Sequence, residues 1–242
     1  MSKLIRGAVI FALLAIGPPA VAGEVFAALY DVYLGGLRAG ELALETKAED
    51  GRYEARGSFR TVGLVALFAS TEMEVEVFGR LNGTGFEPVL FISREREGDR
   101  ERLVRVVWNA PGGPRVEATP PYRKKPWSIR PEDQGDALDP LTALVAVLAP
   151  RPAEKLCDRR IDAFDGRYRF AFEIGPVERD DGRLVCRGRY LRVAGFKPKK
   201  MRSRNARIPF VLTFEPRSDG SQQVVRVDAR TKLGRAVVRL RR

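Results

Sequence analysis

Polar and apolar side chains alternate along much of the chain with a period of two. In Tyr53–Arg60, apolar and small residues occupy the odd positions, and charged or hydroxyl residues occupy the even ones. The same alternation recurs in Glu72–Val77 and in Arg167–Ile174. This period is typical of β-strands that bury one face and expose the other. The pattern therefore predicts several half-buried strands.

Short turn signals separate these stretches. Pairs that end in glycine tolerate the positive φ angles that two-residue hairpin turns require. Many strands joined by tight turns indicate an antiparallel sheet. We therefore predict an all-β fold with one or two short helices, built on a strongly curved antiparallel sheet or a barrel-like one. The pairs are Gly35-Gly36, Asp50-Gly51, Asn82-Gly83, Asp165-Gly166, Asp181-Gly182 and Asp219-Gly220.

One segment departs from the alternation. Leu141–Ala149 is almost entirely apolar, and Pro150 follows it. Asp139 is a favoured N-cap residue and Pro140 suits the first helical position, so these signals predict a helix. A helix that is apolar on all sides is buried. We expect a buried helix near 140–149 that covers or fills the concave face of the sheet.

Two other segments bear on the organisation of the chain. Gly63–Ala69 is short and apolar, and its pattern fits either a helical turn or a buried strand. Pro111–Pro131 is rich in proline and glycine, and we expect a long loop there. The strand pattern resumes afterwards with the same character. We therefore predict a single β-rich domain over residues 23–242.

Residues 1–22 have the features of a secretory signal. Lys3 and Arg6 give a positive start, and an apolar run follows over Ala8–Ile16. Ala20-Val21-Ala22 has the small residues of a cleavage site. The apolar run is about half of the roughly 20 residues that span a bilayer, and no later stretch is apolar enough. We expect an exported, periplasmic protein without a transmembrane span after signal cleavage.

The two cysteines, Cys157 and Cys186, fit an oxidising compartment. In that compartment we expect them to form a disulfide. The bond would stabilise the fold by roughly 3–4 kcal/mol on the chain-entropy model. Two free buried thiols are the alternative, and the absence of a Cys-x-x-Cys spacing disfavours a redox-active pair.

Composition narrows the chemistry. The chain of 242 residues carries a net charge of +12 and no histidine, which excludes Ser-His-Asp and Cys-His catalysis and histidine-ligated metals. It also lacks a nucleophile elbow and a phosphate-binding glycine loop, and the acidic residues before the predicted helix lack calcium-loop spacing. We predict no enzymatic activity, cofactor or metal. Glu72, Glu74 and Glu76 share one strand face, so a carboxylate-dependent hydrolase is a third hypothesis.

The most basic segment is Arg187–Arg207, which has nine Lys and Arg side chains and no acidic residue. Such a cluster is typical of sites that bind the phosphates of lipid headgroups or lipopolysaccharide, whereas export excludes nucleic acid. A solvated hairpin is the alternative. A second basic run, Arg123–Trp127, includes an aromatic residue and suits a membrane surface or a solvated loop. The candidate binding residues are Arg192, Lys197, Lys199, Lys200 and Arg202.

Several motifs occur in a distinctive order. They are Tyr30–Gly40, Asp139–Leu144, Phe164–Phe170 between the two cysteines, and Gly195–Lys197. Their order and spacing resemble an uncharacterised proteobacterial envelope family, domain of unknown function 3108. The resemblance implies a periplasmic all-β protein and supplies no activity or catalytic residues. Its style is also similar to Lol-type lipoprotein carriers, in which a curved sheet covered by helices holds acyl chains, a likeness of fold alone.

These features lead to a first hypothesis. The protein is a non-enzymatic periplasmic binding or carrier protein for a lipophilic or anionic envelope component, such as a lipid or a lipopolysaccharide-type anion. The basic run meets the headgroup, and the concave face takes the apolar part. The alternative is a structural or protein-interaction module of envelope biogenesis with a fully packed core and a protein partner. Peripheral membrane contact is a further expectation.

Overall fold

The structure is a computed structural model that describes residues 24–83, 85–232 and 234–242. The predicted signal segment, 1–22, lies outside the described residues. Within them the chain forms one antiparallel sheet of 13 strands and three short α-helices. The predicted all-β class with a strongly curved sheet is confirmed, with one short helix more than expected.

Each strand pairs antiparallel with its neighbours. In chain order the strands are β1 (Glu24–Leu34), β2 (Leu37–Glu49), β3 (Arg52–Thr61), β4 (Thr71–Asn82), β5 (Gly85–Glu97), β6 (Arg100–Val107), β7 (Arg115–Thr119), β8 (Arg159–Phe164), β9 (Arg169–Asp180), β10 (Arg183–Ala194), β11 (Arg207–Pro216), β12 (Gln222–Thr231) and β13 (Gly234–Leu240). The α-helices are α1 (Gly63–Phe68), α2 (Pro140–Leu148) and α3 (Pro198–Met201). The short 3-10 helices are η1 (Pro131–Gln134), η2 (Ala153–Lys155) and η3 (Arg204–Ala206).

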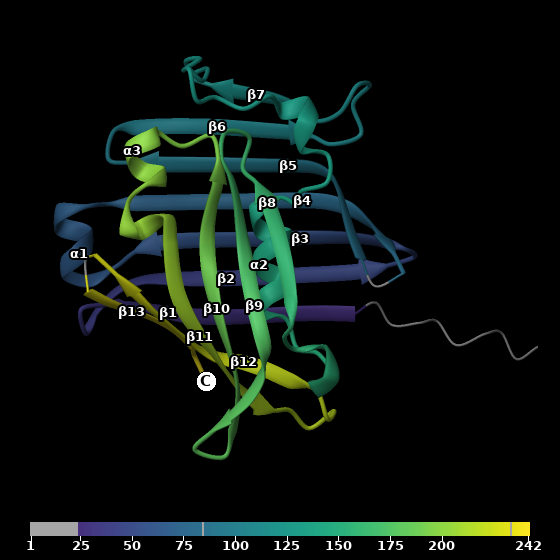
Figure 1. The fold of residues 1–242 in the computed structure, drawn as a ribbon, viewed down its shortest axis with the longest axis vertical. Coiled ribbons are helices and arrows are strands. Elements are labelled where there is room, and N and C mark those ends of the chain that lie inside the picture. The colour runs from purple at the N-terminus through teal and green to yellow at the C-terminus, as the bar shows by residue number, and fades with distance from the viewer. Residues whose placement is uncertain (1–23, 84, 233) are drawn as a thin grey trace, which may run out of the picture.

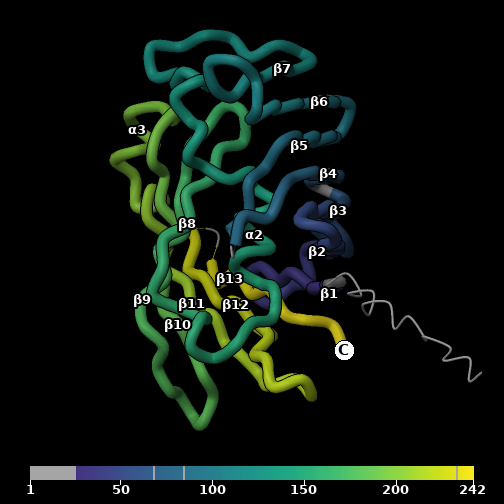
Figure 2. Tube along the Cα trace, turned by 90° about the vertical axis from the view of Figure 1, so that its right-hand side faces the viewer, coloured from purple at the N-terminus to yellow at the C-terminus, as the bar shows by residue number. Residues whose placement is uncertain are grey.

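The sheet is open, because the strands at its two edges, β7 and β8, do not pair with each other. Strands β7 to β1 follow one another across the sheet, β1 pairs with β13, and the order then runs back to β8. Figure 1 shows that the sheet folds over itself, so that β8–β11 cross in front of β2–β5. Figure 2 shows the two layers from the side, with α2 between them. The curvature is therefore strong, without barrel closure.

The helix α2 occupies the space between the two layers. Its N-cap is Asp139, whose Oδ1 accepts a hydrogen bond from the backbone N–H of Thr142 at 2.9 Å. Seven of its nine residues are buried, and the other two, Pro140 and Leu144, are half-buried. Leu141 Cδ1 lies 2.8 Å from the position that a Cβ would take on Gly57, so helix and sheet are in close contact. The prediction of a buried helix after an Asp139 cap is confirmed.

Two hydrogen bonds link the helix region to the back layer of the fold, the part of the sheet that lies behind β8–β11 in Figure 1. Tyr53 Oη and Thr142 Oγ1 lie 2.9 Å apart in the core. Trp108 Nε1 donates to the Ala137 carbonyl at 2.9 Å. All four residues are buried, so these bonds satisfy polar groups that water does not reach. The buried side chains of α2 belong to the same hydrophobic core as those of the sheet, so the protein's own side chains pack around the helix.

Two segments differ from a simple interpretation of the sequence. Gly63–Ala69 contains the helix α1, on which Leu64 and Leu67 are exposed, so it is not a buried strand. The expected continuous loop over 111–131 is wrong in part, because it contains β7, which pairs with β6. This strand is only five residues long and lies between prolines, so its alternation is too short to stand out.

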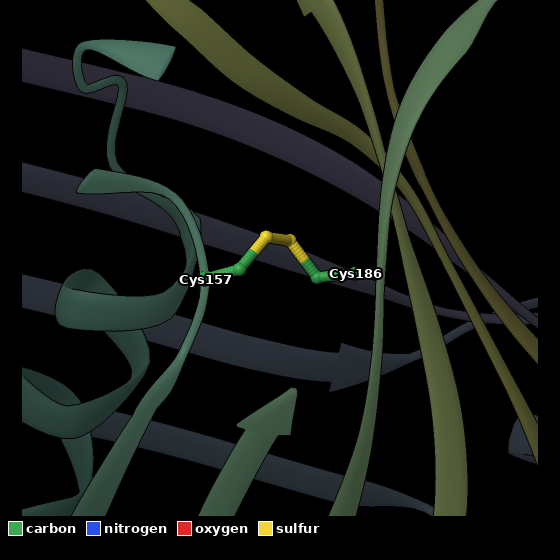
Figure 3. The surroundings of a disulfide bond; sticks show 2 residues. All are labelled: Cys157 and Cys186. Atoms are coloured by element: carbon green, nitrogen blue, oxygen red, sulfur yellow. A yellow bond between two sulfur atoms is a disulfide. The ribbon is translucent and has the colours of Figure 1, made fainter. Parts of the chain in front are cut away.

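Cys157 and Cys186 form the predicted disulfide (Figure 3), with their Cα atoms 6.0 Å apart. Cys186 is fully buried on β10, and Cys157 lies shortly before β8. The bond therefore ties the segment that enters the front layer to a strand inside that layer. Among the described residues, no α-helix has the length and apolarity needed to cross a membrane.

Candidate functional site

The predicted basic run divides into a paired part and an unpaired part. On the exposed side of β10, Arg187 pairs with Glu178 and Arg189 pairs with Glu173, both at 3.0 Å. Beyond residue 190, the described basic residues of the run make no ion pair. The first part is therefore largely neutralised on the sheet surface, and the second part keeps its positive charge.

The five predicted binding residues lie near the end of β10, on α3 and at the two ends of α3. Arg192 is half-buried, and its Nη1 donates to the Lys200 carbonyl at 3.0 Å. Lys197 is exposed, and its Nζ lies 5.9 Å from the centre of the Trp127 ring, which brings the two basic runs together. The remaining candidates are exposed on α3 or just after it, and they are Lys199, Lys200 and Arg202.

Arg192 is the last member of a series of stacked cations and aromatic rings, which we call the ladder. A cation over an aromatic face is attracted by the ring by about 0.5–2 kcal/mol. The ladder joins β6, the segment after β7, the β8–β9 turn and the end of β10, which lie far apart in the sequence. The distances from guanidinium carbon to ring centre are 5.1 Å for Arg102–Tyr122, 5.2 Å for Arg167–Tyr122, 5.0 Å for Arg167–Tyr168 and 5.2 Å for Arg192–Phe196. The rings of Tyr168 and Phe196 stack with their centres 4.3 Å apart.

Backbone contacts fix the middle of the ladder. Asp165 Oδ1 accepts hydrogen bonds from the backbone N–H groups of Arg167 at 2.8 Å and Tyr168 at 2.6 Å, which shapes the β8–β9 turn. Gly195 has a φ of +87°, and a Cβ there would lie 2.4 Å from the Arg167 carbonyl oxygen. Only glycine therefore allows the two segments to touch. Figure 1 places β6, β7 and α3 at one end of the molecule, and this is the end where the ladder lies.

The ladder arginines keep their charge without a carboxylate partner. Arg102 and Arg167 make no ion pair within the described residues, and Arg102 Nη1 instead donates to the Pro120 carbonyl at 2.8 Å. Burial raises the pKa of Tyr122 to about 12, so its ring stays neutral. Burial also raises the pKa of Asp165, against the opposing effect of its backbone hydrogen bonds.

A surface pocket of 370 Å³, which we call the basic pocket, lies beside the ladder. All of its charged lining residues are cations, and proline and tyrosine complete the lining. An adjoining pocket of 310 Å³ shares Pro121, Tyr122, Arg123 and Arg167 with it. Both volumes lie at the small end of the range for ligand sites. The lining residues of the basic pocket are Arg102, Pro120, Pro121, Tyr122, Arg123, Lys125 and Arg167.

Two of the three glutamates singled out in the sequence line a neighbouring pocket, which shares Arg102 and Pro120 with the basic pocket. Glu72 and Glu74 are exposed on β4 and line a pocket of 460 Å³ together with Glu95 and Glu101. Arginines are interleaved with them, and Arg96 pairs with Glu101 at 2.5 Å. Among the residues that the structure describes, no three His, Cys, Asp or Glu side chains are placed to hold a metal ion. This surface is a solvated network of ion pairs.

Sequence reasoning missed four of the ladder residues. Arg102 lies in an alternating stretch that is typical of any half-exposed strand, and Tyr122 lies in the expected loop. An arginine stands next to a tyrosine at Arg167-Tyr168, but also at Arg52-Tyr53 and Arg189-Tyr190 outside the ladder, so this local pattern does not single the ladder out. The stacking of the ladder residues depends on contacts between segments distant in sequence. The missed residues are Arg102, Tyr122, Arg167 and Tyr168.

Comparison with known proteins places the chain in a family. The family model described as "Protein of unknown function (DUF3108)" matches residues 29–241, which is most of the chain. No curated protein and no solved structure gives a significant match, so the likeness to Lol-type carriers stays a prediction. The order of motifs noted above agrees with the family match. The chain therefore belongs to the DUF3108 family of proteins of unknown function.

Proposed function

We propose that this protein is a non-enzymatic binding protein of the periplasm that holds the phosphate-bearing headgroup of an envelope lipid or glycolipid in the basic pocket. The observation that carries the proposal is the lining of that pocket. Four cationic side chains meet there and no carboxylate is among the lining residues. A site of this kind attracts anions and repels none of them through its own side chains.

The two ladder arginines in the pocket are held in place before any ligand arrives. Arg167 lies between the rings of Tyr122 and Tyr168, and Arg102 is fixed by Tyr122 and the Pro120 carbonyl. A guanidinium group recognises phosphate by parallel hydrogen bonds, and a preordered side chain loses less conformational entropy on binding. These contacts support a phosphate site rather than a diffuse patch of charge.

The rest of the pocket supports a headgroup rather than a bare ion. Pro120, Pro121 and Tyr122 give it an apolar wall beside the cations. That wall suits the glycerol or sugar to which a lipid phosphate is attached. Because α2 fills the central interior, the proposal places the ligand on the surface and does not require an acyl chain inside the fold. The disulfide and the predicted signal segment support a periplasmic location.

One observation favours a second function. The packed interior around α2 is what a structural or protein-interaction module of envelope biogenesis requires. In that case the ladder serves only to join the front layer to the segment after β7, and a protein partner replaces the lipid. The two functions differ in whether phosphate competes for the basic pocket.

The test is calorimetric titration at low salt with short-chain phosphatidylglycerol, short-chain phosphatidylcholine and inorganic phosphate. We expect phosphatidylglycerol to bind and Arg102→Gln/Arg167→Gln to weaken it about tenfold or more. The matched control, Arg187→Gln/Arg189→Gln, removes the same charge from the ion-paired surface of β10 and should change the affinity by no more than about twofold.

The outcomes separate the alternatives. Tighter binding of phosphatidylglycerol than of inorganic phosphate identifies a lipid headgroup, and equal binding identifies free phosphate. No binding of either, or equal losses in the two double variants, contradicts the proposal. Lys125→Gln removes a charge from the pocket lining at an exposed position outside the ladder. A loss of affinity in this variant therefore cannot result from misfolding of the ladder.

A further inference from the structure

The three most exposed large apolar side chains among the described residues lie at the start of β2 and on α1, where the strands of the back layer end; we call this surface the α1 edge. They are Leu67, which is 77% exposed, Leu64, which is 62% exposed, and Leu37, which is 55% exposed. The helix α1 packs against β2, where Val62 N–H donates to the Ala39 carbonyl at 3.0 Å. Figure 1 shows α1 at the outer end of the strands, beside the ends of β1 and β13.

The sequence around α1 is unusual for this chain. Residues 61–71 contain no charged side chain, although 31% of all residues are charged. Leu64 and Leu67 are three positions apart on a helix, so they share one face. No side chain caps α1 at its N-terminus, and nothing in the described fold covers the two leucines. Contiguous exposed apolar side chains of this kind mark a surface that contacts something else.

The neighbouring turns indicate what α1 contacts. The β12–β13 hairpin lies next to the β1–β2 turn, where Gly35 N–H donates to the Arg235 carbonyl at 2.9 Å. This hairpin carries Arg230 and Lys232, neither of which makes an ion pair within the described residues. A protruding apolar helix with unpaired cations beside it complements the apolar interior and anionic headgroups of a lipid surface.

The opposite flank carries the other sign of charge. Gly98 N–H donates to the Ser70 carbonyl at 3.2 Å, so the β5–β6 turn with Glu97 and Asp99 adjoins the end of α1. The charges on the two flanks therefore offset each other in part. Attachment through this edge should depend mainly on the leucines and only weakly on anionic lipid.

We infer that α1 is a membrane-docking element, in which Leu64, Leu67 and Leu37 insert into the interface of a lipid bilayer. This inference does not rest on the basic pocket. The two surfaces are distinguishable, because the pocket requires a phosphate-bearing anionic headgroup and the α1 edge requires an apolar surface. A protein with both surfaces is held at a membrane while it samples the headgroups there.

The experiment is co-sedimentation with vesicles of phosphatidylcholine alone and of phosphatidylcholine mixed with phosphatidylglycerol. We expect the wild type to bind both, and Leu64→Asn/Leu67→Asn to lower partitioning about tenfold or more on both. The control is Val177→Asn, which changes a 47% exposed apolar side chain on another strand end and should leave partitioning unchanged. Arg102→Gln/Arg167→Gln should keep its binding to phosphatidylcholine alone.

A second measurement locates the contact. Leu67→Trp should be quenched by brominated lipid, and Val177→Trp should not, against the same background from the two native tryptophans. The inference is overturned if the wild type binds neither vesicle, or if the double asparagine variant binds as well as the wild type. Loss of the anionic-lipid preference alone would count against the basic pocket and leave α1 supported.

Discussion

Asp139 gives a quantitative test of how the buried helix is held in the fold. Its carboxyl group is fully buried, with Oδ1 capping α2 and Oδ2 without a hydrogen-bond partner among the described residues. Burial raises the pKa of this carboxyl from 3.8 to about 6. The folded protein therefore binds the Asp139 proton more tightly than the unfolded chain does.

The sign of the pH dependence follows. Because the folded-state pKa lies above the unfolded one, Asp139 lowers stability as the pH rises through the window between the two values. A shift of this size lowers the contribution of Asp139 to the free energy of unfolding by about 2 kcal/mol between about pH 4 and pH 7.5. Asp139→Asn keeps an oxygen for the Thr142 N–H and has no carboxyl to ionise. We expect its free energy of unfolding, relative to the wild type, to rise by about 2 kcal/mol over this range.

The assay is urea denaturation at several pH values, followed by the fluorescence of the buried Trp108. Asp136→Asn is a matched control in the same segment. Hydrogen bonds from Arg169 lower the pKa of Asp136, so its carboxylate stabilises the fold at neutral pH and that contribution is lost on acidification. The two variants should therefore differ from the wild type in opposite directions at neutral pH. Parallel pH profiles for the wild type and Asp139→Asn would refute the reasoning.

Two further predictions concern the packing of the sheet. Cys157→Ala/Cys186→Ala opens a link between positions 29 residues apart, and should lower the free energy of unfolding by about 3–4 kcal/mol in guanidinium titrations; a loss below about 1 kcal/mol would contradict this. Gly79→Ala places a Cβ 2.2 Å from Tyr53 Cε1 and should destabilise the fold by about 1–3 kcal/mol, and an unchanged melting temperature would show that the sheet adapts.

Local patterns in the sequence predicted local structure well. The alternation in Tyr53–Arg60 and Glu72–Val77 corresponds to β3 and β4, because a strand with one buried face imposes a period of two on its own residues. The Asp139-Pro140 signal marks the start of α2, because the capping hydrogen bond forms within one turn of chain. Each of these signals lies within a single element.

Features that depend on distant segments were not predictable in the same way. The pairing of β1 with β13 joins the two ends of the described fold, as in the register of Tyr30 with Leu240. The same holds for the ladder, since Tyr122 and Arg167 stack only after the sheet has folded over itself. Leu64 and Leu67 show the converse, because an apolar run predicts burial and only the tertiary structure reveals that nothing covers it. The basic runs could be identified from the sequence, but their contact through Lys197 and Trp127 depends on the tertiary structure.

The central claim is that a phosphate-bearing headgroup binds at the basic pocket, and the two tryptophans test it most directly. Trp127 lies beside Lys197, two positions after the pocket residue Lys125, and Trp108 is buried with its indole N–H hydrogen-bonded to the Ala137 carbonyl. In a titration with short-chain phosphatidylglycerol followed by indole NMR, the account predicts a saturable shift of the Trp127 resonance and a stationary Trp108 resonance. A Trp127 resonance that does not move, or that moves equally with phosphatidylcholine, would contradict it.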